Sequence, residues 1–253
     1  MQRPGHRSSP SAPGRFLRGG VRAWLVVLAL AGIGGGGAIA AQDGPTPRRA
    51  AFQQERPSAD VRHIADWAIA SGDNAGMPYI VVDKINARLF VFDADGRLRG
   101  ATSALLGLAR GDHSVPGIGS RKLSTILPEE RTTPAGRFVA SLDRSLAGEE
   151  ILWVDYDSGV ALHRVIATVP KERRLQRLES GVPLEHRITF GCINVPVKFY
   201  ENVVSPAFTG TSGIVYVLPE TRPVREVFGS YDVGGAAADD SGRQGGRAAG
   251  SSP

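Results

Sequence analysis

The feature that most constrains the fold of this chain is a succession of short runs of β-branched and aromatic residues between residues 78 and 220. Residues 79–83 read YIVVD, residues 88–93 read RLFVFD, and the turn dipeptide Asp95-Gly96 follows them. Runs of this composition, bounded by turn signals, are typical of β-strands. The pattern predicts a mainly β domain, with further strands over 100–108, 137–141, 151–155, 160–165 and 213–218.

Helical patterns are few by comparison. Ser58 can cap a helix over residues 59–70, in which apolar residues fall on one face. Residues 171–180 form a strongly charged amphipathic stretch, and Pro196 can open a short helix that runs to about residue 204. We therefore expect a β-sandwich or mixed sheet that carries one or two short helices at its edge.

The two ends of the chain do not have the composition of a globular core. Residues 42–77 combine a polar, proline-containing linker with the short helix, and residues 78–220 form the predicted domain. Residues 221–253 are predicted to be a C-terminal extension that is mostly disordered. The reason is that Gly, Ala and Ser dominate from residue 229 onward, so too little apolar surface is present to offset the entropy of ordering.

Residues 1–41 have the pattern of a secretory leader. A stretch with arginines precedes an apolar run over 23–33, and the small residues at 38–40 (AIA) suit a signal peptidase that reads A-x-A. The segment between residues 23 and 42 carries no charge, which equally allows an uncleaved N-terminal membrane anchor. Both alternatives predict an exported protein of the periplasm or cell envelope.

The charge of the whole chain belongs to this leader. The formal net charge is +5, and the first forty residues contain five arginines and no acidic residue. The remainder of the chain is therefore neutral. A neutral body gives no electrostatic reason to expect a nucleic acid as partner.

The cysteine content gives the first indication of chemistry. Cys192 is the only cysteine in the chain, so no internal disulfide can form. An unpaired thiol in an oxidising compartment is vulnerable to oxidation, which favours a functional role for it. Gly191 directly precedes it and permits a tight turn that exposes the thiol. The same turn leaves the backbone N–H groups of Gly191 and Cys192 free to bind a developing oxyanion.

A thiol nucleophile needs a base, because its ordinary pKa is about 8.5. His163 lies near the end of a predicted strand, where a sheet would hold it in place. His186 stands between Glu185 and Arg187, and His113 lies in a Gly-rich loop, so we expect both of these side chains on the surface. His163 is therefore the predicted base.

Four motifs in order carry a resemblance to a known family. A strand pair of the form I-x-V-D…L-x-V-F lies at 80–92, and T-P-x-G-x-F lies at 133–138. An upstream histidine follows at His163, and residues 189–194 (TFGCIN) match the signature [S/T]-x-G-C-x-[N/R]. Over about residues 78–220 the chain resembles the catalytic domain of the L,D-transpeptidase (YkuD-type) family, as a divergent member.

The resemblance implies a β domain whose cysteine attacks a peptide bond in a peptidoglycan stem. Cys192 would form a thioester and His163 would act as its base. The carbonyl of Arg164 would orient the imidazole, and backbone N–H groups around Phe190 to Cys192 would bind the oxyanion. Thr189, Phe190 and Gly191 thus belong with Arg164 to the oxyanion and orienting residues. The partner implied is a peptidoglycan stem peptide, and neither a metal nor an organic cofactor is implied.

The sequence departs from the family pattern at several points. Phe190 stands where the family usually has His, and Arg164 stands where Gly is common. Residues 171–180 fill an insertion that we expect to form a lid, and the loop over 111–131 is also long. On the substrate side we expect contacts from Asn194 and Arg187, with Arg164 or Arg187 binding a carboxylate.

Three alternatives remain open at this stage. The same thioester could be resolved by water, which would make the chain an L,D-carboxypeptidase or hydrolase. A catalytically silent wall-binding module is possible because the histidine at position 190 is lost. The side-chain types would also suit zinc, although no pair has the short spacing of such sites; the residues concerned are His113, His163, His186 and Cys192.

Overall fold

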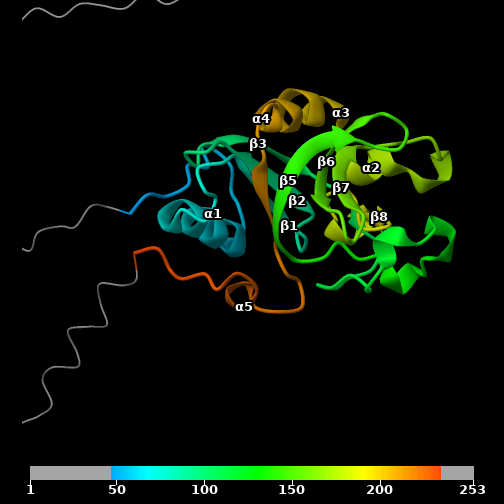
Figure 1. The fold of residues 1–253 in the computed structure, drawn as a ribbon, viewed down its shortest axis with the longest axis horizontal. Helices are drawn as coiled ribbons and strands as arrows, with labels where there is room; N and C mark the ends of the chain where they lie inside the picture. Colours follow the sequence, from blue (N-terminus) through cyan, green and yellow to red (C-terminus); the bar gives the residue numbers. More distant parts are fainter. Residues whose placement is uncertain (1–46, 235–253) are drawn as a thin grey trace, which may run out of the picture. The chain divides into compact units, whose positions relative to one another are not determined.

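The computed structural model describes residues 47–234, and these are drawn in colour in Figure 1. The predicted signal peptide or anchor over 1–41 and the end of the predicted extension over 235–253 lie outside the described residues. Between residues 47 and 234, no helix has both the length and the apolar character that crossing a bilayer would require.

The predicted mainly β class is confirmed, and most predicted strands are present within a residue or two of their expected limits. The region expected as one strand over 100–108 instead divides at Ala104 and Leu105 into β3 and β4. The strands are β1 (Tyr79–Asp83), β2 (Arg88–Phe92), β3 (Leu98–Ser103), β4 (Leu106–Gly107), β5 (Gly136–Arg144), β6 (Glu150–Asp155), β7 (Val160–Arg164), β8 (Arg187–Thr189), β9 (Ile193–Val195) and β10 (Gly213–Val217).

The sheet is mixed and curls strongly. Eight strands follow the order β3-β2-β1-β10-β5-β6-β7-β9, and β4 and β8 form a separate pair. The pairs β1–β10, β7–β9 and β4–β8 are parallel, whereas the other pairs are antiparallel. Residues 136–140 of β5 pair with β10 and residues 141–144 pair with β6, so this long strand joins the two halves (Figure 1).

The two edges of the eight-stranded sheet nearly meet. Leu105, just beyond β3, exchanges two backbone hydrogen bonds with Asn194 of β9, at 2.8 and 2.9 Å. This bridge brings the loop after β3 against the strand that follows Cys192. The curled sheet surrounds an aliphatic core whose members include Ile80, Leu152 and Val215.

The half of the sheet formed by β1, β2 and β10 is buried on both faces. In β1, Ile80 belongs to the inner core, whereas Tyr79 belongs to a second core rich in aromatic residues. Alternate residues of a strand point to opposite faces, so a strand covered on both sides needs apolar residues throughout. This explains why YIVVD and GIVYV are nearly continuous apolar runs.

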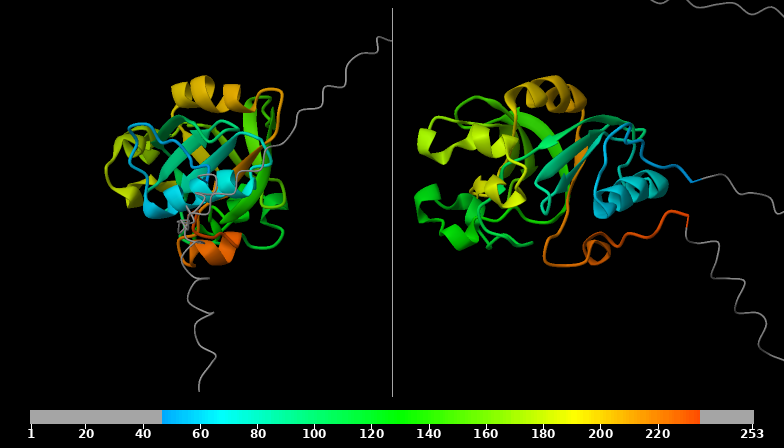
Figure 2. Two further views of the ribbon diagram at one scale, coloured as in Figure 1. Left: turned by 90° about the vertical axis from the view of Figure 1, so that its left-hand side faces the viewer. Right: turned by 180° about the vertical axis from the view of Figure 1, so that it is seen from behind.

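Helix α1 (Ala59–Ser71) covers this aromatic face (Figure 2). The Ser58 side chain accepts a hydrogen bond from the backbone N–H of Val61, as predicted for an N-cap, and Gly72 ends the helix with φ of 74°. Ile64 and Trp67 are among the residues that α1 buries against Tyr79 and its neighbours.

The remaining helices lie at the edges of the sheet. Residues after Pro196 form more helix than the predicted short segment, because a turn of π-helix continues α3 into α4. Inside the predicted insertion, the helix α2 (Arg174–Glu179) is anchored to the domain because Leu178 packs against Leu105 and Val165. The helices are α2 (Arg174–Glu179), α3 (Val197–Phe199), the π-helix η6 (Tyr200–Val204), α4 (Ser205–Phe208) and α5 (Val224–Phe228).

The beginning of the predicted C-terminal extension is folded, which corrects the prediction for residues 221–234. α5 packs Val224 and Phe228 against the aromatic core. Beyond it, Ser230 is buried and its hydroxyl lies 2.8 Å from His63 Nε2 of α1. The Val233 carbonyl accepts a hydrogen bond from Arg49. Residues 221–234 are folded because Val224 and Phe228 supply the apolar contacts that the glycine-rich residues lack.

Candidate active site

Two neighbouring strands bring the predicted nucleophile and base close together. β7 and β9 run parallel, and their register places His163 opposite Asn194. Cys192 lies directly before β9, two residues before Asn194. Because alternate residues of a strand share a face, Cys192 and Asn194 project toward the side that carries the His163 imidazole. The β7–β9 edge of the sheet therefore collects these three side chains.

The turn before Cys192 requires glycine for two reasons. Gly191 has φ of 133°, a value that residues with a side chain rarely adopt. A Cβ atom at this position would also lie only 2.8 Å from the carbonyl oxygen of Thr132. Thr189 fixes the same turn, since its hydroxyl donates to the Cys192 carbonyl at 2.6 Å and accepts from the Gly191 N–H at 3.1 Å.

Thr133, to which the sequence assigned no role of its own, supports this turn from behind. Its side chain is fully buried. The hydroxyl donates to the Gly191 carbonyl at 2.8 Å and accepts from the Gly107 N–H at 2.9 Å. The first residue of the T-P-x-G-x-F motif therefore ties the cysteine turn to β4. Its place in that motif was the only signal that could have indicated such a role.

The His163 ring is held through both of its nitrogen atoms. Nδ1 donates to the carbonyl of Arg164 at 2.8 Å, the contact that the family resemblance implies. Nε2 lies 3.0 Å from Asn194 Nδ2, and because the amide nitrogen is a donor, Nε2 accepts this hydrogen bond. The ring is therefore neutral with its proton on Nδ1, and the lone pair on Nε2 accepts the hydrogen bond from Asn194.

Cys192 is half-buried, and its thiol does not contact the predicted base directly. Its Sγ lies 3.7 Å from the Gly159 carbonyl, and among the described residues no hydrogen bond joins it to His163. Burial raises the pKa of the thiol, although the Ala161 backbone and the Arg174 charge act in the opposite direction. Burial also lowers the pKa of His163. The resting pair is thus a neutral thiol beside a neutral imidazole.

The predicted oxyanion donors are only partly free. The Gly191 N–H is engaged by the Thr189 hydroxyl, which corrects the expectation that this amide would be available. Within residues 47–234, the amides of Phe190 and Cys192 donate to no carbonyl or side chain. These two N–H groups flank the cysteine turn and remain available to a negatively charged oxygen.

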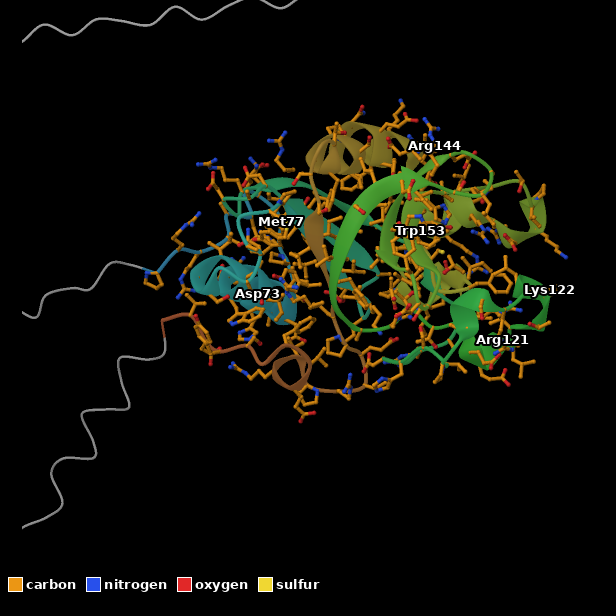
Figure 3. All side chains as sticks on the ribbon, in the orientation of Figure 1. Asp73, Met77, Arg121, Lys122, Arg144 and Trp153 are labelled. Atoms are coloured by element: carbon orange, nitrogen blue, oxygen red, sulfur yellow. The ribbon has the colours of Figure 1, made fainter. Side chains whose placement is uncertain are left out.

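Phe190 occupies the position where the family usually has histidine. Its ring stacks under the guanidinium of Arg131, whose central carbon lies 4.0 Å from the ring centroid. Arg131 also donates two hydrogen bonds to the Ile126 carbonyl, so it closes the long loop that ends beside the T-P-x-G-x-F motif. Figure 3 labels Arg121 and Lys122 farther out on the same loop.

Arg187 does not reach toward Cys192, contrary to the expectation that it binds substrate. It is buried, and its guanidinium pairs with Glu220 at 2.6 Å and donates to the Lys84 carbonyl at 2.8 Å. Lys84 in turn pairs with Asp112 at 2.9 Å. We call this balanced set the buried ion cluster; it comprises Lys84, Asp112, Arg187 and Glu220.

The guanidinium of Arg164 is also occupied. It pairs with Glu201 at 3.2 Å, donates to the Glu150 carbonyl at 3.0 Å and lies over the ring of Tyr200. These partners fix it on the side of the sheet that α3 and the π-helix cover. Neither arginine that the sequence offered as a carboxylate ligand is therefore free at the thiol.

The insertion instead delivers a different arginine. Arg174, the first residue of α2, donates from Nη1 to Asn194 Oδ1 at 2.9 Å, and its Nε pairs with Glu172 at 2.6 Å. This contact extends a chain of polar groups outward from the imidazole. We call the resulting set the thiol site; it comprises Cys192, His163, Asn194 and Arg174.

Neither His113 nor His186 belongs to the thiol site. His113 is exposed, as predicted. His186 is buried rather than on the surface, because its short helical turn packs inward and its Nε2 lies 3.1 Å from the Ser180 carbonyl. In the described part of the chain no three His, Cys, Asp or Glu side chains gather as metal ligands, so the residues of the alternative zinc site remain apart.

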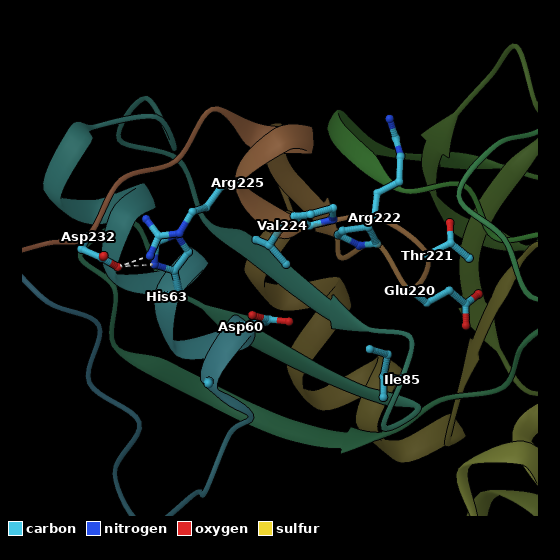
Figure 4. A pocket seen from close by; sticks show the side chains of 12 residues that line it. Asp60, His63, Ile85, Glu220, Thr221, Arg222, Val224, Arg225 and Asp232 are labelled. Carbon is cyan, nitrogen blue, oxygen red and sulfur yellow. Dashed lines mark hydrogen bonds and ion pairs between the residues drawn. The ribbon is translucent and has the colours of Figure 1, made fainter.

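A pocket of about 550 Å³ lies elsewhere, between α1 and the C-terminal segment (Figure 4). His63 Nδ1 lies 3.3 Å from the Asp232 carboxylate at one side of it, and Glu220 and Thr221 lie at the other. Neither Cys192 nor His163 lines this pocket. The chemistry of the thiol site is therefore separate from it.

Comparison with known proteins gives a limited result. No protein-family model matches the chain, and no curated protein matches it. Among solved structures, the helical cell shape determining protein Pgp2 from Campylobacter jejuni is 15% identical over 58% of this chain and 49% of its own, with a TM-score of 0.39. Its K307A mutant is 14% identical over 66% of this chain and 58% of its own, with a TM-score of 0.40.

The catalytic domain of an L,D-transpeptidase from E. faecium is also similar. It is 19% identical over 56% of this chain and 96% of its own, with a TM-score of 0.33. The chain spans about half the length of Pgp2.

Proposed function

We propose that this chain is an exported, cysteine-dependent L,D-transpeptidase that acts on peptidoglycan stem peptides through a thioester. The leader pattern at 1–41 supports export to the periplasm or cell envelope. The ordered motifs between residues 78 and 220 support the substrate class.

The observation that carries the proposal is the anchoring of His163 beside the only thiol of the chain. The Arg164 carbonyl holds Nδ1, which leaves Nε2 as the atom able to accept a proton. The parallel pairing of β7 and β9 keeps Cys192 within the same group of side chains. The glycine turn and two unengaged amide N–H groups complete the parts that acyl transfer needs.

In the first half of the reaction, the Cys192 thiol gives its proton to His163 Nε2 and the sulfur attacks the carbonyl carbon of the scissile bond. For this step Nε2 must exchange the Asn194 amide for the thiol. The Phe190 and Cys192 amides stabilise the oxyanion. The C–N bond then breaks, the leaving amine takes the proton from His163, and a thioester remains.

In the second half, an amine of another stem attacks the thioester carbonyl. Its proton passes to His163 Nε2, the C–S bond breaks, and the sulfur recovers the proton. Water in place of the amine would give the L,D-carboxypeptidase outcome on the same bond. In each half the imidazole takes up one proton and releases it again, so His163 ends the cycle in its starting protonation state.

A second candidate function is favoured by one observation. The resting thiol is neutral because burial raises its pKa, and the Nε2 of His163 is bonded to Asn194 and not to the sulfur. A catalytically silent wall-binding module would have this arrangement permanently. An enzyme would have it only until substrate enters the site.

The test incubates the full-length chain with purified tetrapeptide muropeptides and an added D-amino acid, followed by mass spectrometry. The Cys192→Ala variant is the control. Cross-linked dimers or exchange of the terminal D-residue would support transpeptidation, whereas a tripeptide product alone would support the carboxypeptidase. Binding of both proteins to insoluble peptidoglycan, with no Cys192-dependent product, would contradict the enzyme and favour the silent module.

A further inference from the structure

The insertion places a cation at the thiol site. Arg174 begins α2, and Leu178 on the same helix is buried against Leu105 and Val165. The Leu178 carbonyl also accepts a hydrogen bond from Ser103 at 2.6 Å. α2 is therefore packed onto the sheet and lies near β7 (Figure 1). The first residue of α2, Arg174, donates a hydrogen bond to Asn194 of β9.

The guanidinium of Arg174 is only partly used by its protein partners. Its side chain is 15% exposed, with Nη1 bonded to Asn194 and Nε bonded to Glu172. Within residues 47–234, Nη2 donates to no atom. A largely buried guanidinium with unengaged N–H groups has both the charge and the planar geometry to bind a carboxylate.

The charge of Arg174 acts on both reacting groups. It lowers the pKa of His163, after the larger effect of burial, and it opposes the rise that burial causes in the pKa of Cys192. Glu149 acts on His163 in the opposite direction. No other arginine exerts such an effect on Cys192 among the causes of its shift. Geometry places the cation at the same site, because Arg174 donates to the side chain of Asn194, two residues after Cys192.

We propose that Arg174 is the specificity-determining residue of the thiol site and binds a substrate carboxylate beside the carbonyl that Cys192 attacks. This inference rests on the proposed function. It reassigns to the insertion the role that the sequence had suggested for Arg164 or Arg187, both of which the fold engages elsewhere. Peptidoglycan stems carry carboxylates near the scissile bond, so selection for one of them has a chemical basis.

The experiment compares two alkylating probes of nearly equal size, iodoacetate and iodoacetamide, on the full-length chain. In both cases the Cys192 thiolate displaces iodide, and since the chain has one cysteine the modified site is unambiguous. The measured quantity is the ratio of the two alkylation rates, obtained by intact-mass spectrometry. A loss of fold would change both rates, whereas a loss of carboxylate recognition changes their ratio.

We expect Arg174→Gln to lower the iodoacetate-to-iodoacetamide ratio by roughly tenfold, because a partly buried cation with unengaged N–H groups attracts the anionic probe. Arg174→Lys should retain part of the preference, since it keeps the charge and loses the planar fork. Arg173→Gln is the matched control, because the adjacent arginine is exposed. It should keep the wild-type ratio.

An unchanged ratio in Arg174→Gln, or an equal fall in Arg173→Gln, would overturn the proposal. Failure of both probes to modify the folded wild-type chain would also overturn it, because the site would then be closed to a carboxylate. Alkylation requires no turnover. Muropeptide transfer with no Arg174-dependent preference would therefore refute Arg174 alone, and a clear preference with no transfer would refute the proposed function alone.

Discussion

The buried ion cluster and the thiol site lie on opposite sides of Thr133, and they differ in burial and in how many of their polar groups are paired. Lys84 donates to the Thr133 carbonyl at 2.9 Å, while the Thr133 hydroxyl donates to Gly191 beside the nucleophile. In the ion cluster the Lys84, Asp112 and Glu220 side chains have no exposure. In the thiol site, Cys192 is half-buried and Arg174 retains unengaged N–H groups.

The difference shows how to separate structural polar groups from reactive ones. In the ion cluster, burial lowers the pKa of Lys84, but its charge is matched by carboxylates and carbonyls on every side. Burial would raise the pKa of Asp112, yet hydrogen bonds from Thr221 and Lys84 hold it below its usual range. A cluster whose charges and hydrogen-bonding groups are all paired has none available to bind a ligand, whereas the thiol site retains the unengaged N–H groups of Arg174.

The largest expected effect tests the thiol site. His163→Ala should reduce muropeptide transfer by several orders of magnitude, because it removes the imidazole whose Nε2 takes the thiol proton. Cys192→Ala should abolish transfer. His113→Ala is the matched control, since this exposed histidine has no contact with the site. Product formation is followed by chromatography, and near-normal transfer by His163→Ala would mean that another base serves Cys192.

The next largest effect tests the ion cluster. Lys84→Met should lower the free energy of unfolding by about 3–5 kcal/mol, because it leaves the buried carboxylates Asp112 and Glu220 with Arg187 as the one buried cation of the cluster. Lys122→Met, on the exposed loop, should have almost no effect. Urea denaturation measures both variants. Equal stabilities for the two would show that the cluster is not closed to water.

Thr133 should affect both regions at once. Thr133→Val keeps the shape but leaves the Gly107 N–H and the Gly191 carbonyl without their partner, at a cost of about 1–3 kcal/mol for each buried group. Thr133→Ser keeps the hydroxyl and should lose much less. Denaturation and the Cys192 alkylation rate are measured together. A stable Thr133→Val with unchanged alkylation would remove Thr133 as the link between the two regions.

The pH dependence of the thiol gives a smaller effect with a definite sign. Burial raises the pKa of Cys192, so the folded chain holds the thiol proton to higher pH than the unfolded chain, where a thiol ionises near about 8.5. Iodoacetamide should modify the folded protein with a profile displaced to higher pH than in urea. Folding stability should decline as pH rises above this value, and Cys192→Ala should lack that part of the decline.

A profile displaced to lower pH than that of the unfolded chain would contradict a neutral resting thiol. It would place a thiolate next to a cation before substrate arrives. The comparison between the two regions would then change, because the thiol site would also be a charge-balanced pair at rest.

The smallest effect lies at the C-terminal segment after α5, which belongs to neither region. Ser230→Ala should cost about 0.5–1.5 kcal/mol, because it removes the hydrogen bond to His63 on α1. Ser120→Ala, whose hydroxyl bonds within an exposed turn, is the control. Thermal unfolding compares them. No difference between the two would mean that residues after α5 add nothing measurable to the core.

Much of the fold could be predicted because it depends on local composition. β1 and β10 are apolar along nearly their whole length since both of their faces are covered, and such runs are visible in the sequence. Ser58 predicted the start of α1 because its side-chain oxygen can accept a hydrogen bond from the first turn of a helix. α5 was missed because a helix of one turn leaves too short a pattern, and its residues are recognised only by what Val224 and Phe228 touch.

By itself, the sequence determined that the chain has one thiol and that a glycine precedes it. It also predicted a mainly β domain in which a strand carries His163. The tertiary structure alone decided which arginine bonds to Asn194 in the thiol site and which lies buried against Glu220. It also decided that Asn194 occupies the lone pair of His163. The physical reason is that strand and turn preferences act between neighbours, whereas a charge selects its partner across the whole packed chain.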